Sequence, residues 1–359
     1  MELNIALIKG DGIGPEIAAE AVKVLKVIEN KFNHKINLIN VIAAGEAVDK
    51  YGNPLPIESL DVCKKSDAIL FANLGGSKWD QNPIDKMPEK SLVLLRKEIK
   101  TTLNIRPVNI NNELINLSPL KTEVIGSGFD IIVIRDIIGG MINGTKTRTV
   151  GEFGREASDV EYYNEELIKN VAEYGFKIAR TRNKKLTSLD KANVLASSKL
   201  WREIVTEVAY NYPDIIVEHI LIDNAAMEVL KRPCEFDVII TSNLFGDIIA
   251  DELSQITGAA SMLPSIELSN TSKGIYTPNQ LHYPDESIIG LNKANPIGFI
   301  KSVASMLRYT FGLENEARLI EEAVNKVIQK YATEDIYTEG KIKVSTSEMG
   351  DLMKIYMEN

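Results

Sequence analysis

Residues 3–16 read LNIALIKGDGIGPE, an apolar run followed at once by a glycine-rich turn and a proline. The run at 3–8 has the length and composition of a buried β-strand. Apolar residues at helical spacing then extend over 15–29, and a proline with an acidic residue in the first turn is typical of a helix N-terminus. This stretch predicts a strand, a tight turn and a helix, the repeating unit of an α/β fold.

The rest of the chain repeats this alternation. Strands are predicted at 67–71, 130–134, 185–189 and 236–240, and helices at 165–182, 194–210 and 247–256. Strands that alternate with helices of this length indicate an α/β protein with much parallel sheet. No internal repeat and no Pro/Ser-rich linker interrupts the pattern.

Composition excludes several classes of protein. The chain has 359 residues, of which 44% are hydrophobic, so two lobes are expected. It contains no apolar run long enough to span a bilayer, and its N-terminus has no basic region or cleavage site. Cys63 and Cys234 are interpreted as buried apolar residues in a reducing cytoplasm. The net charge of −9 argues against nucleic-acid binding, and three scattered histidines argue against a zinc site.

The glycines at 10, 12 and 14 suggest a dinucleotide-binding turn but do not complete the Rossmann fingerprint. That fingerprint requires its third glycine one residue later, where Pro15 stands. We therefore expect that NAD, if bound, is not held by a Rossmann half. Tight turns without a cofactor explain these glycines equally well.

Two aspartates, Asp247 and Asp251, lie four residues apart on a predicted helix and so share one face. A third, Asp223, follows an apolar run. Such oxygen donors suit Mg²⁺ or Mn²⁺, although a solvated acidic face is the alternative.

Three arginines and one lysine also stand out by context. Arg135 and Lys191 each follow a predicted strand, at the edge where open α/β sheets bind ligands. Guanidinium groups bind carboxylates in a bidentate manner, and a desolvated lysine near other cations can act as a base. The alternative is that Arg96, Arg106 and Arg135 only pair with acidic neighbours. Together these residues suggest metal-assisted chemistry on a small polycarboxylate.

Eight motifs, in this order, resemble those of the 3-isopropylmalate dehydrogenases, within the superfamily that includes isocitrate dehydrogenase. They are residues 10–16 (GDGIGPE), 75–80 (GGSKWD), 88–97 (PEKSLVLLRK), 104–107 (NIRP), 190–195 (DKANVL), 222–227 (IDNAAM), 245–252 (FGDIIADE) and 294–296 (ANP). The resemblance implies a two-lobed α/β fold with mixed sheet and non-Rossmann nucleotide binding. Residues 1–101 with 258–359 would form the NAD-binding lobe, and 102–257 the lobe with the dimer interface, metal and substrate-carboxylate residues.

The resemblance also implies a role for individual residues. The carboxylates of a small 2-hydroxy diacid would be held by Arg96, Arg106 and Arg135, and its γ-alkyl group would face Glu89, Leu92, Val93 and the partner subunit's Val194. The metal, Mg²⁺ or Mn²⁺, would be bound by Asp247, Asp251 and the partner subunit's Asp223, beside the partner subunit's Lys191 as the base. NAD would contact Ile13, Gly76, Glu89, Asp285 and Asn295. Shared active sites would make the homodimer obligatory.

The implied activity is the NAD-dependent oxidative decarboxylation of 3-isopropylmalate to 4-methyl-2-oxopentanoate in leucine biosynthesis. Two regions depart from the family pattern. Ile142 stands where the family has a proton-donating tyrosine, and the loop 277–286 lacks the family's small Gly-Ser-Ala residues although it keeps Asp285. These departures leave open a paralogue that acts on D-malate, tartrate or another 3-alkylmalate with impaired decarboxylation. A non-catalytic relative is the remaining alternative.

Overall fold

The computed structural model describes residues 1–110, 112–282 and 285–359. The chain divides into two compact units, Met1–Thr101 with Ala259–Asn359 (unit 1) and Thr102–Gly258 (unit 2). These bounds differ by one residue from the partition implied by the resemblance. The functions assigned to the two lobes stay predictions. Positions 283 and 284 of the departing loop lie outside the described residues.

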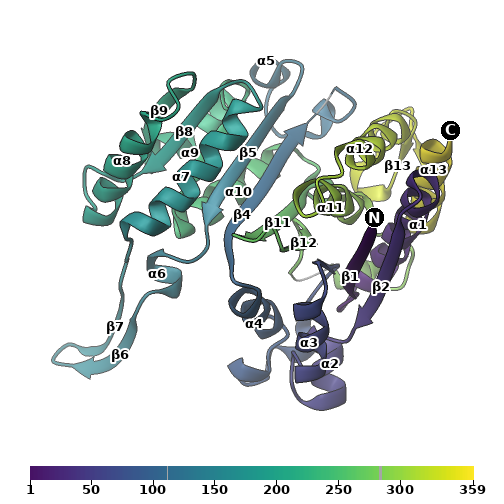
Figure 1. Cartoon of the computed structure of the whole chain (residues 1–359), viewed down its shortest axis with the longest axis horizontal. Helices are drawn as coiled ribbons and strands as arrows, with labels where there is room; N and C mark the ends of the chain where they lie inside the picture. Colours follow the sequence, from purple (N-terminus) through teal and green to yellow (C-terminus); the bar gives the residue numbers. More distant parts are fainter. Residues whose placement is uncertain (111, 283–284) are drawn as a thin grey trace. The chain divides into compact units, whose positions relative to one another are not determined.

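Unit 1 contains five neighbouring strands of mixed sheet, in the order β2-β1-β3-β12-β11 (Figure 1). The strands are β2 (Lys35–Val41), β1 (Glu2–Ile8), β3 (Ala68–Phe71), β12 (Gly274–Pro278) and β11 (Pro264–Ser269). All neighbouring strands are parallel except β11, which runs antiparallel to β12. The predicted strand at 3–8 is therefore confirmed as β1, and chain segments from both ends build one sheet.

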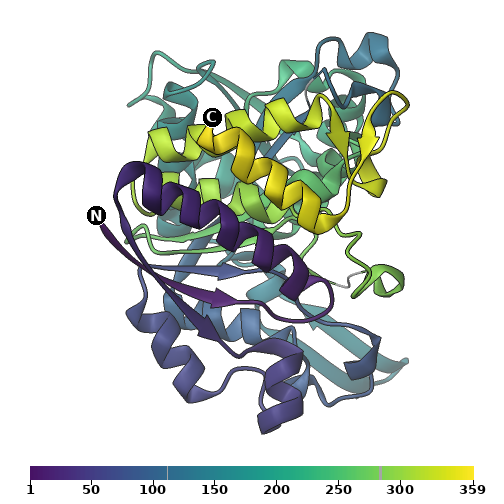
Figure 2. The ribbon, with the colours of Figure 1, turned by 90° about the vertical axis from the view of Figure 1, so that its right-hand side faces the viewer.

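Helices cover both faces of this sheet. One face packs on α1 (Gly14–Phe32) and α11 (Ile297–Tyr309), which in turn pack on α13 (Thr346–Glu358) and α12 (Glu314–Ile328). The other face packs on α2 (Ala44–Tyr51), α3 (Ile57–Lys65) and α4 (Lys90–Ile99). Figure 2 shows α1 and α13 side by side, which brings the first and last helices of the chain together. On the second face, Ile8, Phe71, Cys63 and Leu95 belong to one buried apolar cluster.

Unit 2 contains the strands β4 (Thr101–Ile110), β5 (Phe129–Asp136), β10 (Val238–Thr241), β8 (Lys185–Asp190) and β9 (Ile216–Leu221), in that order. Strand β4 is antiparallel to β5, and the other pairs are parallel. The helices α7 (Glu165–Arg180) and α8 (Ala196–Ala209) pack on one face, and α9 (Ile222–Lys231) and α10 (Asn243–Ile256) on the other. The α/β class with mixed sheet is thus confirmed.

Helix α10 begins at Asn243, four residues before the predicted start at 247. The extra turn matters because it places Asn243 on the helix and at the carboxyl end of β10. Ligand sites in open α/β sheets lie beyond the carboxyl ends of the strands.

A separate hairpin of β6 (Lys146–Gly151) and β7 (Gly154–Asp159) extends from unit 2 (Figure 1). Besides short 3₁₀ turns, the described residues include the short helices α5 (Thr122–Ile125) and α6 (Gly140–Asn143) and the short strands β13 (Tyr331–Ala332) and β14 (Ile342–Lys343).

Two further expectations have an outcome here. Within the described residues, no helix is both long and apolar enough to cross a membrane. Cys63 is buried as expected, but Cys234 is exposed, so its interpretation as a buried residue is wrong. Cys234 lies in a short 3₁₀ turn that precedes β10, and its thiol donates to the carbonyl of Ile125 over 3.0 Å.

Candidate active site

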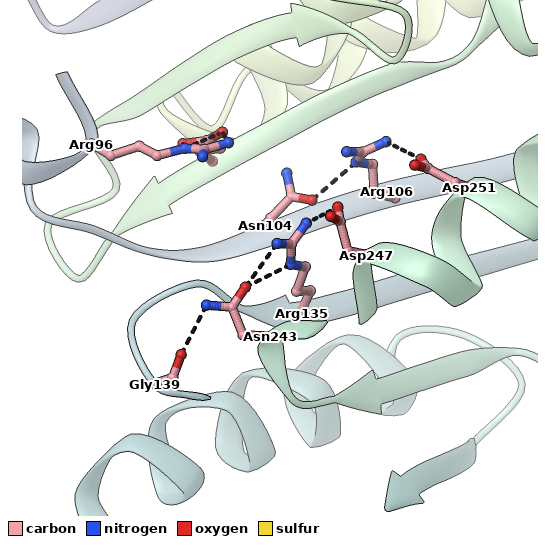
Figure 3. A network of polar contacts seen from close by, with 9 residues as sticks. Arg96, Asn104, Arg106, Arg135, Gly139, Asn243, Asp247 and Asp251 are labelled. Carbon is pink, nitrogen blue, oxygen red and sulfur yellow. Dashed lines mark hydrogen bonds and ion pairs between the residues drawn. The ribbon is translucent and has the colours of Figure 1, made fainter. Parts of the chain in front are cut away.

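Two of the predicted arginines lie on neighbouring strands of unit 2. Arg106 is on β4 and Arg135 is at the end of β5, and the antiparallel register places Asn104 directly opposite Arg135. Residues two apart on a strand point to the same face. The side chains of Asn104, Arg106 and Arg135 therefore gather where β5 meets the N-terminal half of α10 (Figure 3).

Each of these arginines faces one aspartate of α10. Arg135 Nη1 donates to Asp247, and Arg106 Nη1 lies 3.3 Å from Asp251 Oδ1. Two carboxylates four residues apart on a helix repel one another. The two guanidinium groups offset this repulsion, while the aspartate side chains stay 42% and 64% exposed. Figure 3 shows the two pairs side by side, from Arg135 to Asp247 and from Arg106 to Asp251. Their exposed oxygens remain accessible to a ligand.

An asparagine side chain accepts hydrogen bonds from the guanidinium group of each arginine. Asn243 Oδ1 accepts from Arg135 Nε over 3.0 Å and from Nη2 over 2.8 Å, and Asn104 Oδ1 accepts from Arg106 Nε over 3.0 Å. The buried Asn243 amide also donates to the carbonyl of Gly139 over 2.9 Å. Gly246 is required here, because a Cβ at this position would lie 2.8 Å from the side chain of Arg135. The acceptors are neutral, so they orient the guanidinium groups without cancelling their charge.

Behind Asn243 lies a buried tyrosine–carboxylate pair. The Asn243 backbone N–H donates to Tyr163 Oη over 2.8 Å, and the Tyr163 hydroxyl donates to Asp136. Asp136 also accepts from the Gly139 N–H over 2.6 Å. Burial raises the pKa of Asp136 to about 6, and burial likewise raises the pKa of Tyr163. A chain of hydrogen bonds therefore runs from Asp136 to the guanidinium of Arg135.

Lys191 and Asp223, the other two predicted site residues of unit 2, contact each other. Lys191 directly follows β8, Asp223 lies in the first turn of α9, and Lys191 Nζ is 2.5 Å from Asp223 Oδ1. The hydrogen bond from Lys191 lowers the pKa of Asp223. Just before Lys191, the buried Asp190 carboxylate accepts from Arg202 and from the N–H of Ala192, which fixes the backbone on both sides of the lysine.

A divalent cation would find an incomplete set of ligands in one copy of the chain. In the described part of the molecule, no three His, Cys, Asp or Glu side chains are grouped to hold a metal ion. Asp247 and Asp251 nevertheless offer exposed carboxylate oxygens, the donors that Mg²⁺ and Mn²⁺ prefer. These donors fit the expected metal, provided that the third carboxylate comes from a second copy.

The third predicted arginine, Arg96, lies on α4 of unit 1 and has a different partner. Its guanidinium is bound by the carboxylate of Glu267 on β11, with Nε to Oε2 at 2.9 Å and Nη2 to Oε1 at 2.6 Å. Glu267 is buried at 3% exposure, whereas the Arg96 side chain is 37% exposed. Arg96 is thus held by a full negative charge rather than by an amide.

The residues expected to contact NAD lie on turns of unit 1. Ile13 caps α1, Gly76 begins a 3₁₀ turn with φ +150°, and Asn295 Nδ2 lies 3.1 Å from Asp335. The buried Asp11 carboxylate ties its own turn to the first turn of α2 and to the turn at Gly75, since it accepts from the N–H groups of Gly45, Glu46 and Gly75.

The loop 277–286, which differs from the family pattern, contacts this region through Glu286. Glu286 accepts from the N–H and the hydroxyl of Ser77, over 2.6 and 2.9 Å. Asp285 accepts from the N–H of Ser287, so its carboxylate caps the next turn. Neither contact tests the expected bond from Asp285 to a ribose, which stays a prediction.

The residues expected to surround the alkyl group differ in exposure. Leu92 is buried in the apolar cluster of unit 1, whereas Val93 and Val194 are exposed. Glu89 caps α4, and its buried Oε2 has no hydrogen-bond partner within the described residues. Ile142 lies on α6 and is partly exposed. Whether these side chains meet a substrate stays a prediction.

Sequence reasoning missed four residues of these arrangements: Asn243, Tyr163, Asp136 and Glu267. Asn243 could have been found, because it lies four residues before Asp247 and so shares its helix face. Glu267 could also have been found, because it is the one charged residue of strand β11, whose other residues are apolar or carry a hydroxyl group. Tyr163 carries no comparable signal, because its contacts come only from packing.

Comparison with known proteins is consistent with this geometry. The family model described as isocitrate/isopropylmalate dehydrogenase matches residues 4–353. A 3-isopropylmalate dehydrogenase of Clostridium acetobutylicum is 48% identical over 353 residues, 98% of each chain, and that of Clostridium pasteurianum is 45% identical with the same coverage. Among solved structures, isocitrate dehydrogenase from Methylococcus capsulatus matches with a TM-score of 0.83, 27% identity and 99% coverage of both chains.

Proposed function

Because the chain belongs to the isocitrate/isopropylmalate dehydrogenase family, we propose that it catalyses the oxidative decarboxylation of 3-isopropylmalate in leucine biosynthesis, with NAD as the hydride acceptor. Relatives at 44–48% identity over nearly the whole chain carry the name 3-isopropylmalate dehydrogenase, which favours this substrate over D-malate or tartrate. The observation that carries the chemistry is the pair of arginine–aspartate contacts between β4, β5 and α10.

The proposed chemistry uses the residues of that arrangement. Arg106 and Arg135 would bind the carboxylates of the diacid, in orientations set by Asn104 and Asn243. The partner subunit's Lys191 would accept the proton of the 2-hydroxyl through Nζ while C2 gives its hydride to NAD. The β-carboxylate would then leave as CO₂, and the carbon that held it would take up a proton. Ile142 has no group that could donate this proton, so solvent or another residue must supply it.

The metal requirement belongs to the same proposal. Asp247 and Asp251 would hold Mg²⁺ or Mn²⁺ together with the partner subunit's Asp223. When bound, such an ion acts as a Lewis acid that polarises the oxygens at the reacting carbon. NAD rather than NADP is proposed because the carboxylate of Asp285, with Glu286 beside it, would repel a 2′-phosphate.

We propose a homodimer because unit 2 exposes apolar side chains that a second copy of the chain could cover. Every residue of the β6–β7 hairpin is exposed, with Val150 at 80% and the turn residue Phe153 at 91%. An isolated two-stranded ribbon is at best marginally stable in water. Helices α9 and α10 also expose Met227 and Ile248. Exposed apolar surface of this kind marks an interface. The cytoplasmic location stays a prediction from the cysteine content.

One assay tests the proposed function. Purified protein with Mn²⁺ and NAD is offered 3-isopropylmalate, D-malate and tartrate, while NADH and CO₂ are measured separately. We expect NADH and CO₂ in equal amounts from 3-isopropylmalate and much less from the other two acids. Absence of NADH from all three acids would refute the proposal. NADH without CO₂ would mean that the reaction stops at the oxidised diacid.

Lys191→Ala should abolish NADH formation, because the hydroxyl proton then has no acceptor. Lys199→Ala, on the exposed side of α8, is the matched control and should retain full activity. Retained activity in Lys191→Ala would remove Lys191 from the proposed role.

A further inference from the structure

Tyr163 is a buried residue of unit 2 to which the proposed reaction gives no role. It precedes α7, is 7% exposed, and packs edge-to-face against Trp201 with the ring centroids 5.6 Å apart. Its hydroxyl donates to Asp136 and accepts from the backbone N–H of Asn243 over 2.8 Å. Because packing fixes the ring and two hydrogen bonds fix the hydroxyl, Tyr163 is a rigid support for the first residue of α10.

The side chain of Asn243 contacts two parts of the candidate site. Its Oδ1 accepts from Arg135 Nε and Nη2, over 3.0 and 2.8 Å, and its Nδ2 donates to the carbonyl of Gly139 over 2.9 Å. The amide oxygen and nitrogen cannot exchange places, because each would then face a group of its own kind. A fixed Asn243 backbone therefore gives one direction to the amide and, through it, to the guanidinium of Arg135.

The turn at Gly139 and Gly140, where α6 begins, lies directly against the same two side chains. A Cβ at Gly139 would lie 2.5 Å from the Tyr163 ring. A Cβ at Gly140, where φ is +77°, would lie 3.2 Å from Tyr163 Oη and 3.3 Å from Asn243 Cβ. Tyr163 and Asn243 thus connect the start of α6 to Arg135.

We propose that Tyr163 is a positioning residue for the diacid, which acts on Arg135 through Asn243. The inference rests on the proposed function, because that proposal assigns a substrate carboxylate to Arg135. It adds that the affinity for the diacid depends on a buried hydroxyl that does not itself contact the arginine. Without this hydroxyl, the backbone of Asn243 loses its acceptor and the amide gains freedom. Arg135 then spends less time in the orientation that binds a carboxylate through two hydrogen bonds.

Tyr163→Phe keeps the ring and removes the hydroxyl. We expect it to weaken the binding of 3-isopropylmalate about tenfold, the effect of one buried hydrogen bond. Asn243→Ala removes the amide itself and should weaken binding about thirtyfold, because the lost bonds go to a charged group. In the Asn243→Ala background, Tyr163→Phe should cause no further loss, since the hydroxyl then has no amide to orient. Two independent structural defects would instead add their effects.

Tyr276→Phe is the matched control. Tyr276 is a buried tyrosine of unit 1 whose hydroxyl lies 2.7 Å from Thr310 Oγ1, so this change also removes a buried hydroxyl contact. It is not among the predicted site residues, and its loss should leave the affinity unchanged. If Tyr163→Phe unfolds, Asp136→Asn takes its place, because an amide offers one acceptor oxygen where the carboxylate offers two. It holds the hydroxyl less firmly and carries the same expectation of weaker binding.

The experiment is calorimetric titration of the Mn²⁺-loaded full chain and its variants with 3-isopropylmalate. NAD is left out so that no turnover occurs, and thermal unfolding first shows that each variant is folded. Weaker binding to the Phe variant at full stoichiometry, with no further loss in the Asn243→Ala background, supports the inference. Unchanged affinity overturns it, and so does an additive loss in that background. A fall in stoichiometry alone also overturns it, because it reports a smaller folded population.

The two proposals fail in different ways. Equal binding to the natural chain and the Phe variant overturns the role of Tyr163 and leaves the proposed function standing. A natural chain that binds no 3-isopropylmalate refutes the proposed function and the inference with it.

Discussion

Arg96 in unit 1 and Arg135 in unit 2 are the same residue type with the same predicted task, yet their surroundings differ. The Nε and Nη2 groups of Arg135 donate to the amide oxygen of Asn243, and those of Arg96 donate to the carboxylate of Glu267. The hydrogen-bond geometry is nearly the same, with distances of 2.6 to 3.0 Å in both cases. The acceptors differ, because an amide is neutral and a carboxylate is an anion. Arg135 also pairs with a carboxylate, that of Asp247, through Nη1, but this aspartate is 42% exposed whereas Glu267 is buried.

The comparison shows that the motif around an arginine does not establish what it does. An arginine whose Nε is held by an amide and whose carboxylate partner is exposed, like Arg135 with Asp247, can exchange that partner for a carboxylate ligand. An arginine held by a buried carboxylate is mainly part of the structure, and breaking that pair costs stability. The following predictions test this difference, in order of decreasing expected effect.

Asn243→Asp should convert the surroundings of Arg135 into those of Arg96. The change is nearly isosteric, but it puts a charge on the acceptor and removes the donor to the Gly139 carbonyl. We expect kcat/KM for 3-isopropylmalate to fall at least a hundredfold, mostly through KM, because the positive charge that binds the carboxylate is cancelled. Steady-state kinetics measure this, and Asn211→Asp at an exposed turn is the control. A change in kcat alone would contradict the charge argument.

Arg96→Met should affect stability. It leaves the carboxylate of Glu267 buried without its cation, which we expect to lower the free energy of unfolding by about 3 kcal/mol. The double variant Arg96→Met with Glu267→Gln should recover most of this loss, because no charge is left buried. Urea denaturation of the three proteins gives the numbers. If the single variant is as stable as the natural chain, the pair contributes nothing to the fold.

Asp136→Asn tests the network that supports Asn243. The folded pKa of Asp136 is about 6 while its ordinary value is 3.8, so between these values the folded chain holds a proton that the unfolded chain releases. This contribution to stability is complete below pH 3.8 and is lost as pH rises through 6. The stability of the natural chain relative to Asp136→Asn should therefore fall by about 2 kcal/mol between pH 4 and pH 8. Chemical denaturation at several pH values measures this difference, and a flat difference would contradict the raised pKa.

The smallest expected effect concerns the reactivity of the two thiols, Cys63 in unit 1 and Cys234 in unit 2. Burial raises the pKa of the Cys63 thiol to about 12, so it should not react with a thiol reagent at pH 8 in the folded protein. Cys234 is exposed and should react. We expect one labelled thiol per folded chain and two in urea, and Cys234→Ser should reduce the folded count to zero. Labelling of Cys63 in the folded protein would contradict its burial.

Much of the fold followed from local pattern. The strands at 130–134 and 185–189 and the helix at 165–182 appear as β5, β8 and α7 with small shifts at their ends, because their periodicity is strong. The first turn of α10 was missed because Asn243 and Leu244 follow a strand without a proline or glycine break. For the candidate site, the sequence proposed the arginines, the aspartates and Lys191. Most of them occur in recognisable motifs, and Arg135 stands at the end of a predicted strand.

The sequence by itself determined which chemical groups this protein possesses, where several of its strands and helices form and which family it belongs to. The tertiary structure decided which side chain binds each arginine. Arg96 and Glu267 are 171 residues apart in the chain, and Arg135 and Asn243 are 108 residues apart. Contacts over such separations depend on strand order and on which helix face packs on the sheet. No local spacing records them, and they distinguish an arginine whose Nε is held by an amide from one whose Nε is held by a buried carboxylate.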